Sequence, residues 1–284
     1  MESRARKLSP YNKSGHASFN SLAELLAKPL ADGVSSIKEN SRWFDVLYED
    51  RQSDVTLVTF HAALPRRRAT YPLFSGRKLI QDLDANFLAF ADPACGSAES
   101  LSTFWHLGTK RVNAQKFIPA IVNHAKESRS GKHTLFFGSS AGGFAALNYS
   151  AQTPDSGVLV VNPRIDLLAK PEKLPQYAEV VYPGWDLSRV KRLIPTSMAD
   201  LYSKPRQNTV AYLQNTQDDD YFNDHYAPFK EATVGRENVY FKTEAWGLGH
   251  VVPPRDAFLL PLKSMVQSAP AWKYALEDGS FKSA

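Results

Sequence analysis

Short apolar runs of strand length recur along most of the chain, and longer segments with helical spacing separate them. Turn-forming or polar residues bound each run, as is usual for buried strands. The predicted strands are 43–48, 54–60, 86–91, 135–137, 157–162, 209–214 and 239–243. Helical spacing is found at 110–125, 141–147 and 256–266. This alternation predicts an α/β fold in which helices cover both faces of a mostly parallel, doubly wound sheet.

The first part of the chain does not follow this alternation. Residues 1–42 are polar and mixed, and Pro29 interrupts a short amphipathic stretch at 22–30. We therefore expect residues 1–42 to form an N-terminal arm or helix packed on a main domain that spans 43–284.

A second departure is the segment 164–206, which lies between two predicted strands and is too long for an ordinary connection. It contains five prolines and several large aromatic residues, among them Tyr177, Tyr182 and Trp185. We expect a helical, cap-like insertion over the mouth of an active site, where the three aromatic side chains form a wall for substrate binding. A helical crossover on the far side of the sheet is the alternative.

Composition excludes several classes of protein. The chain has 284 residues, 43% of them hydrophobic and 22% charged, which is ordinary for a globular protein. A single cysteine, Cys95, excludes an internal disulfide and a cysteine-built zinc site. The net charge is +5, and Arg66-Arg67-Arg68 forms the only dense basic run, so no nucleic-acid partner is expected. If this run lies near the active site, it favours anionic substrates.

The basic N-terminus is not followed by an apolar core, and no stretch approaches the length of a membrane span. We therefore expect no signal peptide, no membrane span and a cytoplasmic location.

The strongest motif is G-x-S-x-G at Gly138–Gly142, with Ser140 at its centre. It lies between an apolar strand and a helix-forming run, where a sharp turn exposes the serine hydroxyl at the edge of the sheet. No Gly-Lys-Ser/Thr follows, which argues against a phosphate loop. A serine nucleophile is therefore predicted, and a merely structural Gly/Ser turn is the alternative.

A serine nucleophile needs a histidine base and a carboxylate that orients it. His250 follows the last predicted strand in a glycine-flanked loop, and Asp218 follows the penultimate strand. Asp219 and Asp220 remain open as the acid. The order Ser140, Asp218, His250 is typical of α/β-hydrolases. The backbone N–H groups of Ala141 and Ala62 are the predicted oxyanion donors.

On these residues the chain resembles the α/β-hydrolase superfamily over roughly 43–270. The resemblance rests on GSSAGG at 138–143, the acidic loop at Asp218 and the Gly249-His250 pair. It implies an eight-stranded sheet, a Ser-Asp-His triad, and neither a metal nor a cofactor. Where the superfamily often has a His-Gly-Gly sequence, this chain has His61-Ala62-Ala63, which puts the loop shape in doubt.

A fainter similarity links SAGGFAALNY, VVNPRIDL and the segment 212–229 to bacterial surface-glycan proteins, namely accessory-secretion acetyltransferases and capsule-biosynthesis proteins. The first hypothesis is a serine esterase acting on small-molecule carboxylic esters through an acyl-enzyme. The alternative is an O-acyltransferase for carbohydrate or glycoconjugate, with an acylated glycan as its product or substrate. A non-catalytic binding module on a hydrolase scaffold ranks third. The sequence leaves the oligomeric state open.

Overall fold

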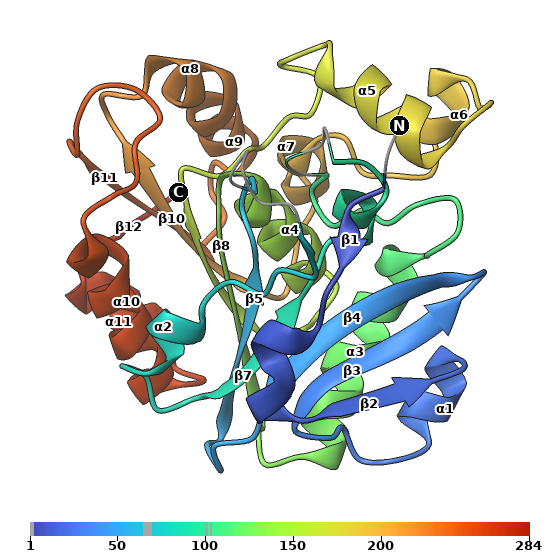
Figure 1. Cartoon of the computed structure of the whole chain (residues 1–284). Coiled ribbons are helices and arrows are strands. Elements are labelled where there is room, and N and C mark those ends of the chain that lie inside the picture. The colour runs from blue at the N-terminus through green and yellow to red at the C-terminus, as the bar shows by residue number, and fades with distance from the viewer. Residues whose placement is uncertain (1–2, 65–69, 100–101, 103) are drawn as a thin grey trace.

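A mixed ten-stranded sheet forms the centre of the computed structural model, which describes residues 3–64, 70–99, 102 and 104–284 (Figure 1). In spatial order its strands are β12 (Lys282–Ser283), β11 (Val239–Glu244), β10 (Thr209–Asn215), β9 (Gly157–Val161), β8 (His133–Ser139), β5 (Val55–Phe60), β7 (Asn86–Phe90), β4 (Arg42–Glu49), β3 (Gly33–Glu39) and β2 (His16–Phe19). The six strands from β11 to β7 are parallel to one another. The prediction of a mostly parallel sheet is confirmed.

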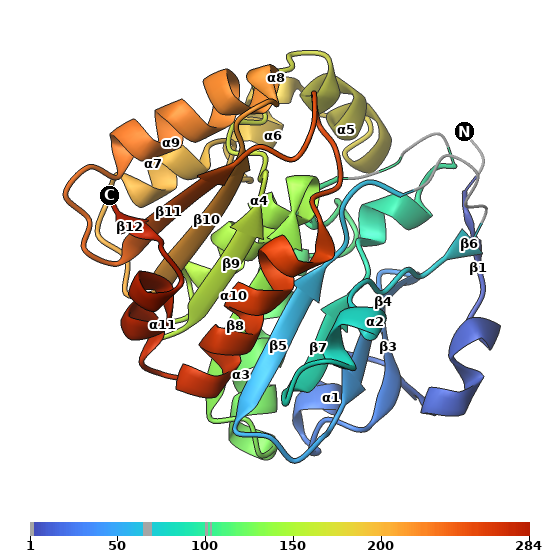
Figure 2. The same ribbon diagram turned by 90° about the vertical axis from the view of Figure 1, so that its left-hand side faces the viewer.

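Helices cover both faces of this sheet (Figure 2). On one face the buried apolar core includes side chains of α1 (Leu22–Leu26), α3 (Ala114–Ser128), α4 (Ser140–Ser150), α5 (Lys173–Val181), α6 (Leu187–Lys191), α7 (Met198–Tyr202) and α9 (Ala227–Ala232). On the other face it includes side chains of α2 (Arg77–Ile80), α10 (Arg255–Ser268) and α11 (Trp272–Asp278). The strands between these two cores are mostly apolar and buried, because neither of their faces meets water.

Several short elements complete the structure. They are a parallel pair of two-residue strands, β1 (Ala5–Arg6) and β6 (Thr70–Tyr71), two 3₁₀ turns at Ser9–Ser14 and Pro93–Gly96, and α8 (Asp219–Tyr221), which continues into a π-helical turn at Phe222–Tyr226. No helix in these described ranges is long and apolar enough to cross a membrane.

The N-terminal residues are part of the sheet and not an arm lying on it. Strand β3 pairs antiparallel with β4, and β2 extends the sheet beyond β3. The sequence pattern does not predict β3, because two of its buried residues are serines, Ser35 and Ser36. Ser36 donates a hydrogen bond to the fully buried carboxylate of Asp45, which also pairs with Arg6. A buried charge with partners on both sides is stable where an isolated one is not.

The segment 164–206 contains α5, α6 and α7. Helices α5 and α6 lie beyond the ends of the central strands, whereas α7 packs against α4 in the helix layer (Figure 1). The Tyr202 hydroxyl of α7 donates to the Leu147 carbonyl of α4 at 2.9 Å. Only part of the segment thus lies where a cap is expected.

Strand β8 and helix α4 meet in a tight turn that requires glycine. A Cβ on Gly138 would lie 2.2 Å from the Gly142 carbonyl oxygen, and one on Gly142 would lie 2.5 Å from that of Phe60. Both contacts are with backbone atoms, which cannot rotate away. The two glycines of the motif therefore let the strand, the helix and the end of β5 approach one another.

This packing predicts that Gly142→Ala lowers the stability of the protein, the reverse of the usual effect of alanine in a helix. Alanine in a helix is normally about 1 kcal/mol more stable than glycine. Here the methyl group overlaps the Phe60 carbonyl, so we expect the free energy of unfolding to fall by about 1–3 kcal/mol. Urea denaturation of the two proteins measures the difference. An unchanged or increased stability would show that β5 can move away at little cost.

Candidate active site

Ser140 occupies the first position of α4 in a strained backbone conformation. Its φ angle is 49°, in the left-handed region that residues with a Cβ rarely adopt. The backbone N–H of Arg164, from the loop after β9, donates to the Ser140 carbonyl at 2.9 Å. Strain of this kind persists where the surrounding structure fixes the residue, and it is common at active sites.

Asp218 and His250 are brought together from two different loops. The Asp218 Oδ2 atom accepts a hydrogen bond from His250 Nδ1 at 2.6 Å, and the Asp218 side chain is 2% exposed. This bond fixes the tautomer that leaves the Nε2 lone pair free to take a proton. Of the three adjacent aspartates, Asp219 and Asp220 are exposed, and Asp220 lies 3.5 Å from Lys170.

The Ser140 hydroxyl has a different partner from the one expected. In the described part of the chain its hydrogen bond is with the Tyr221 hydroxyl, at 3.1 Å, and not with His250. The Tyr221 ring stacks on the His250 ring, with centroids 3.8 Å apart and planes 20° apart. Sequence reasoning missed Tyr221. The available signal was an aromatic residue three positions after the proposed acid.

Ser140 and His250 line the same cavity, of about 220 Å³, together with Ala62, Ala63 and Asn162. Ala141 follows Ser140 at the start of α4, where backbone N–H groups have no partner within the helix. The predicted oxyanion donors thus border the nucleophile. Asn162, with a φ angle of 40°, is a further buried polar residue of the cavity that sequence reasoning missed.

A buried polar network holds the loop that contains Ala62. His61 donates from Nδ1 to the Ala62 carbonyl at 2.8 Å, and its Nε2 accepts from the Asp92 backbone N–H at 3.2 Å. His106 donates from Nε2 to the His61 carbonyl at 3.3 Å. The Asp92 carboxylate accepts backbone N–H groups of Ala94, Phe104 and His106. These bonds give the His61-Ala62-Ala63 loop a defined shape without the glycines that are frequent in hydrolases.

Burial sets the ionisation of this network. It raises the pKa of Asp92 and lowers the pKa of His106 well below its ordinary value. The imidazole of His106 therefore stays uncharged, and the proximity of His61 adds to the effect. The hydrogen bonds of the two histidines hold the loop that contains Ala62.

A larger cavity of about 610 Å³ adjoins the Ser140 cavity and shares Ala62, Ser139, Val252 and Pro253 with it. Its lining includes four phenylalanines and three basic side chains: Phe60, Phe74, Phe137, Phe258, Arg77, Lys78 and Arg255. Arg77 pairs with Glu49, and Arg255 pairs with Asp82. This neighbouring space is therefore lined by both apolar and basic side chains.

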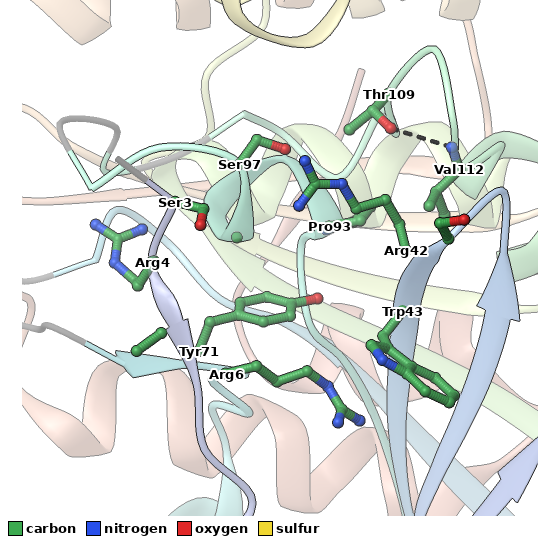
Figure 3. Close-up of a pocket in the computed structure, with 13 residues that line it drawn as sticks. Ser3, Arg4, Arg6, Arg42, Trp43, Tyr71, Pro93, Ser97, Thr109 and Val112 are labelled. Atoms are coloured by element: carbon green, nitrogen blue, oxygen red, sulfur yellow. Dashed lines mark hydrogen bonds between the residues drawn. The ribbon is translucent and has the colours of Figure 1, made fainter. Parts of the chain in front are cut away.

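A separate recess of about 260 Å³ shares no residue with the Ser140 cavity. Arg4, Arg6 and Arg42 surround Tyr71 there (Figure 3). Arg6 is neutralised by its pair with Asp45, and Arg4 donates to the Cys95 and Glu99 carbonyls. The recess is basic but lies outside the site described above.

The three aromatic residues expected to bind substrate lie elsewhere. Tyr177 is fully buried and donates to the Gly108 carbonyl at 2.9 Å, and Tyr182 is 6% exposed. Tyr182 stacks on Trp185, which also lies 3.6 Å below the guanidinium of Arg189. None of the three lines the Ser140 cavity. They hold α5 against the loop after β7, because large aromatic residues contribute the most apolar area to a small helical segment.

Arg66–Arg68, which would favour anionic substrates near the cleft, lie outside the described residues. In the ranges that are described, no group of three His, Cys, Asp or Glu side chains is placed to hold a metal ion. The site therefore consists of a serine, a histidine–aspartate pair and a tyrosine.

No protein-family model matches the sequence, and no curated protein matches it. Several solved structures, in contrast, are similar to this chain. The capsule O-acetyltransferase of Neisseria meningitidis serogroup A is 16% identical, with a TM-score of 0.59, over 80% of this chain and 95% of that chain. An esterase of Pyrococcus furiosus is 16% identical, with a TM-score of 0.52, over 93% and 98% of the two chains.

A glycosylation-associated protein complex from Streptococcus agalactiae also matches, with a TM-score of 0.51 and 15% identity. That match covers 72% of this chain and 40% of the other. Identities this low show shared architecture and nothing finer. The parallel sheet, the serine turn between β8 and α4, and these similar structures together establish that the chain has the α/β-hydrolase fold.

Proposed function

We propose that this protein is a serine esterase that cleaves carboxylic esters through an acyl-enzyme on Ser140. The observation that carries the proposal is the 2.6 Å bond between His250 and Asp218 beside the strained Ser140 in one cavity. Three residues from separate loops, in the order typical of α/β-hydrolases, are hard to explain by packing alone. The similarity to an esterase and to an O-acetyltransferase supports the same chemistry.

The first half of the reaction forms the acyl-enzyme. His250 Nε2 takes the proton of the Ser140 hydroxyl as Oγ attacks the ester carbonyl, and the carbonyl electron pair moves to its oxygen. Asp218 stabilises the imidazolium that results. The backbone N–H groups of Ala141 and Ala62 bind the oxyanion, which is the largest single source of rate enhancement in such sites. His250 then gives its proton to the departing alcohol.

In the second half, a water or an alcohol attacks the acyl-enzyme. His250 takes the proton of the attacking hydroxyl and returns one to Ser140 Oγ as the C–Oγ bond breaks. For either half, His250 Nε2 must come within hydrogen-bond distance of Ser140 Oγ, while Oγ keeps its contact with the Tyr221 hydroxyl. Side-chain rotation between staggered positions allows such an adjustment.

A second function, O-acyl transfer to a carbohydrate hydroxyl, has specific support. The meningococcal capsule enzyme matches over 95% of its length, and it has also been solved with CoA. A glycosylation-associated complex matches as well. In this version the donor is an acyl thioester or ester, and the acceptor is a sugar hydroxyl instead of water.

Replacing the nucleophile tests the shared step. We expect Ser140→Ala to lower kcat for p-nitrophenyl acetate by ~10³-fold or more, because only binding and oxyanion stabilisation remain. A fluorophosphonate probe should label the parent at Ser140, as mass spectrometry of the peptides would show. Turnover by Ser140→Ala at the parent's rate would rule out the acyl-enzyme.

The assignment of the acid can be tested with its neighbour as the control. Asp218→Asn keeps the shape of the side chain but cannot hold the required histidine tautomer, so we expect kcat to fall on the order of 10³-fold. Asp219→Asn changes an exposed carboxylate one residue away, and its kcat should stay within about twofold of the parent value. A large loss in Asp219→Asn with little change in Asp218→Asn would transfer the role to Asp219.

Product analysis separates hydrolysis from transfer. The protein is supplied with p-nitrophenyl acetate or acetyl-CoA and a panel of hexose and N-acetylhexosamine acceptors. An esterase releases acetate at a rate that the sugars do not change, and acetylated sugar stays at the level of the Ser140→Ala blank. Accumulation of acetylated sugar in preference to free acetate would favour the transferase.

A further inference from the structure

One residue, Tyr221, contacts all three residues of the proposed triad. Tyr221 places its hydroxyl 3.1 Å from Ser140 Oγ and stacks its ring on His250. Its backbone N–H donates to the Oδ1 atom of Asp218 at 3.4 Å, while Oδ2 binds the histidine. Tyr221 is only 6% exposed, so these contacts are made away from bulk water. A residue that merely filled space would not need a hydroxyl at the nucleophile.

Arg164 holds the tyrosine in this position. Its Nη2 atom donates to the Tyr221 hydroxyl at 3.2 Å, and its backbone N–H holds the Ser140 carbonyl. The Arg164 side chain is 9% exposed, and its guanidinium also lies 5.5 Å from the centre of the Tyr221 ring. Burial, aided by the Arg164 charge, lowers the pKa of the adjacent His225 to about 3, so that this imidazole is uncharged near neutral pH. Arg164 is therefore the positive group next to the phenol.

The donor and acceptor roles of the groups set the direction of the hydrogen bonds that link Arg164, Tyr221 and Ser140. Arginine can only donate, so Arg164 occupies a lone pair of the Tyr221 oxygen. The Tyr221 proton is then free to be donated to Ser140 Oγ. Hydrogen bonds in a chain polarise one another, and a phenol that accepts from a cation is a stronger donor. With Oγ accepting from Tyr221, the serine's own proton remains available for His250.

We propose that Tyr221, held by Arg164, is a fourth catalytic residue, which donates a hydrogen bond to Ser140 Oγ and supports the His250 ring. This inference rests on the proposed function. The Tyr221 proton is not transferred in either half of the reaction. Its bond stabilises the negative charge that Oγ acquires as His250 removes the serine proton, and again as the C–Oγ bond breaks in deacylation. The stacked ring stabilises the imidazolium through its electron-rich face.

Tyr221→Phe is the decisive variant, because it removes the hydroxyl and keeps the stacked ring. We expect the second-order rate constant for fluorophosphonate labelling of Ser140, and kcat for p-nitrophenyl acetate, to fall roughly 10- to 100-fold. KM should stay within about twofold, since the hydroxyl acts on the reacting atom and not on bound substrate. Circular dichroism and urea denaturation check that the variant is folded.

Tyr226→Phe is the matched control. It removes a hydroxyl from a buried tyrosine on the same stretch of chain, whose ring packs on Tyr212 and Phe222 and not on the triad. Labelling and turnover by this variant should match the parent. A purely structural role for Tyr221 would instead make the two variants alike in rate.

Arg164→Met tests whether Arg164 acts on Ser140 through the Tyr221 hydroxyl. It keeps the backbone N–H that holds Ser140 and removes the cation from the phenol. We expect a smaller loss than in Tyr221→Phe, and the double variant should be no slower than Tyr221→Phe alone, because Arg164 acts through the tyrosine hydroxyl. If the rate losses of the two single variants add up fully in the double variant, Arg164 does not act through the Tyr221 hydroxyl. This variant also tests the inference if Tyr221→Phe does not fold.

The results separate this inference from the function on which it rests. An inactive Ser140→Ala together with a Tyr221→Phe that is labelled at the parent's rate would overturn the role of Tyr221 and leave the acyl-enzyme intact. An active Ser140→Ala would overturn both.

Discussion

The close approach of β8, α4 and the end of β5 is the constraint on which the site depends. Gly138 and Gly142 allow backbone atoms to meet at distances that no other residue tolerates. Ser140 lies between these two glycines, in a left-handed conformation at the start of a helix. The strain is local, and the packed sheet on both sides supplies the stability that retains it. The position of Ser140, the proposed nucleophile, is thus set by the packing of strand and helix.

Two further contacts fix what surrounds the serine. The loop after β9 holds the Ser140 carbonyl through Arg164, and the loop after β5 is held by the buried network of His61, His106 and Asp92. This network gives the His61-Ala62-Ala63 loop a defined shape without glycine residues. The site is therefore built from loops that are each anchored to a different strand, which is the usual way a rigid α/β scaffold positions side chains.

Sequence reasoning was strongest where periodicity and spacing carry the information. The central strands and the long helices follow from apolar runs, and Ser140, Asp218 and His250 were selected by their places after successive strands. It missed β2 and β3, because Ser36 of β3 is buried through hydrogen bonds with Asp45, Arg6 and His16, which the sequence pattern does not reveal. It also treated the aromatic residues of 164–206 as a binding surface. Composition cannot tell an aromatic wall from an aromatic core, and Tyr177 belongs to the core. Tyr221 and Arg164 were missed because their contact depends on where the folded backbone directs the two side chains, which the sequence pattern does not show.

The two edge strands of the central sheet bear on whether copies of the chain can pair edge to edge. A long, flat, unpaired edge strand invites another chain to add to it. Here the outer strands are short: β12 has two residues and β2 has four. Where β12 leaves β11 uncovered, Lys242 and Glu244 form an ion pair with 3.0 Å between Nζ and Oε1. Charges at such a position oppose the pairing of a strand from another chain with this edge of the sheet.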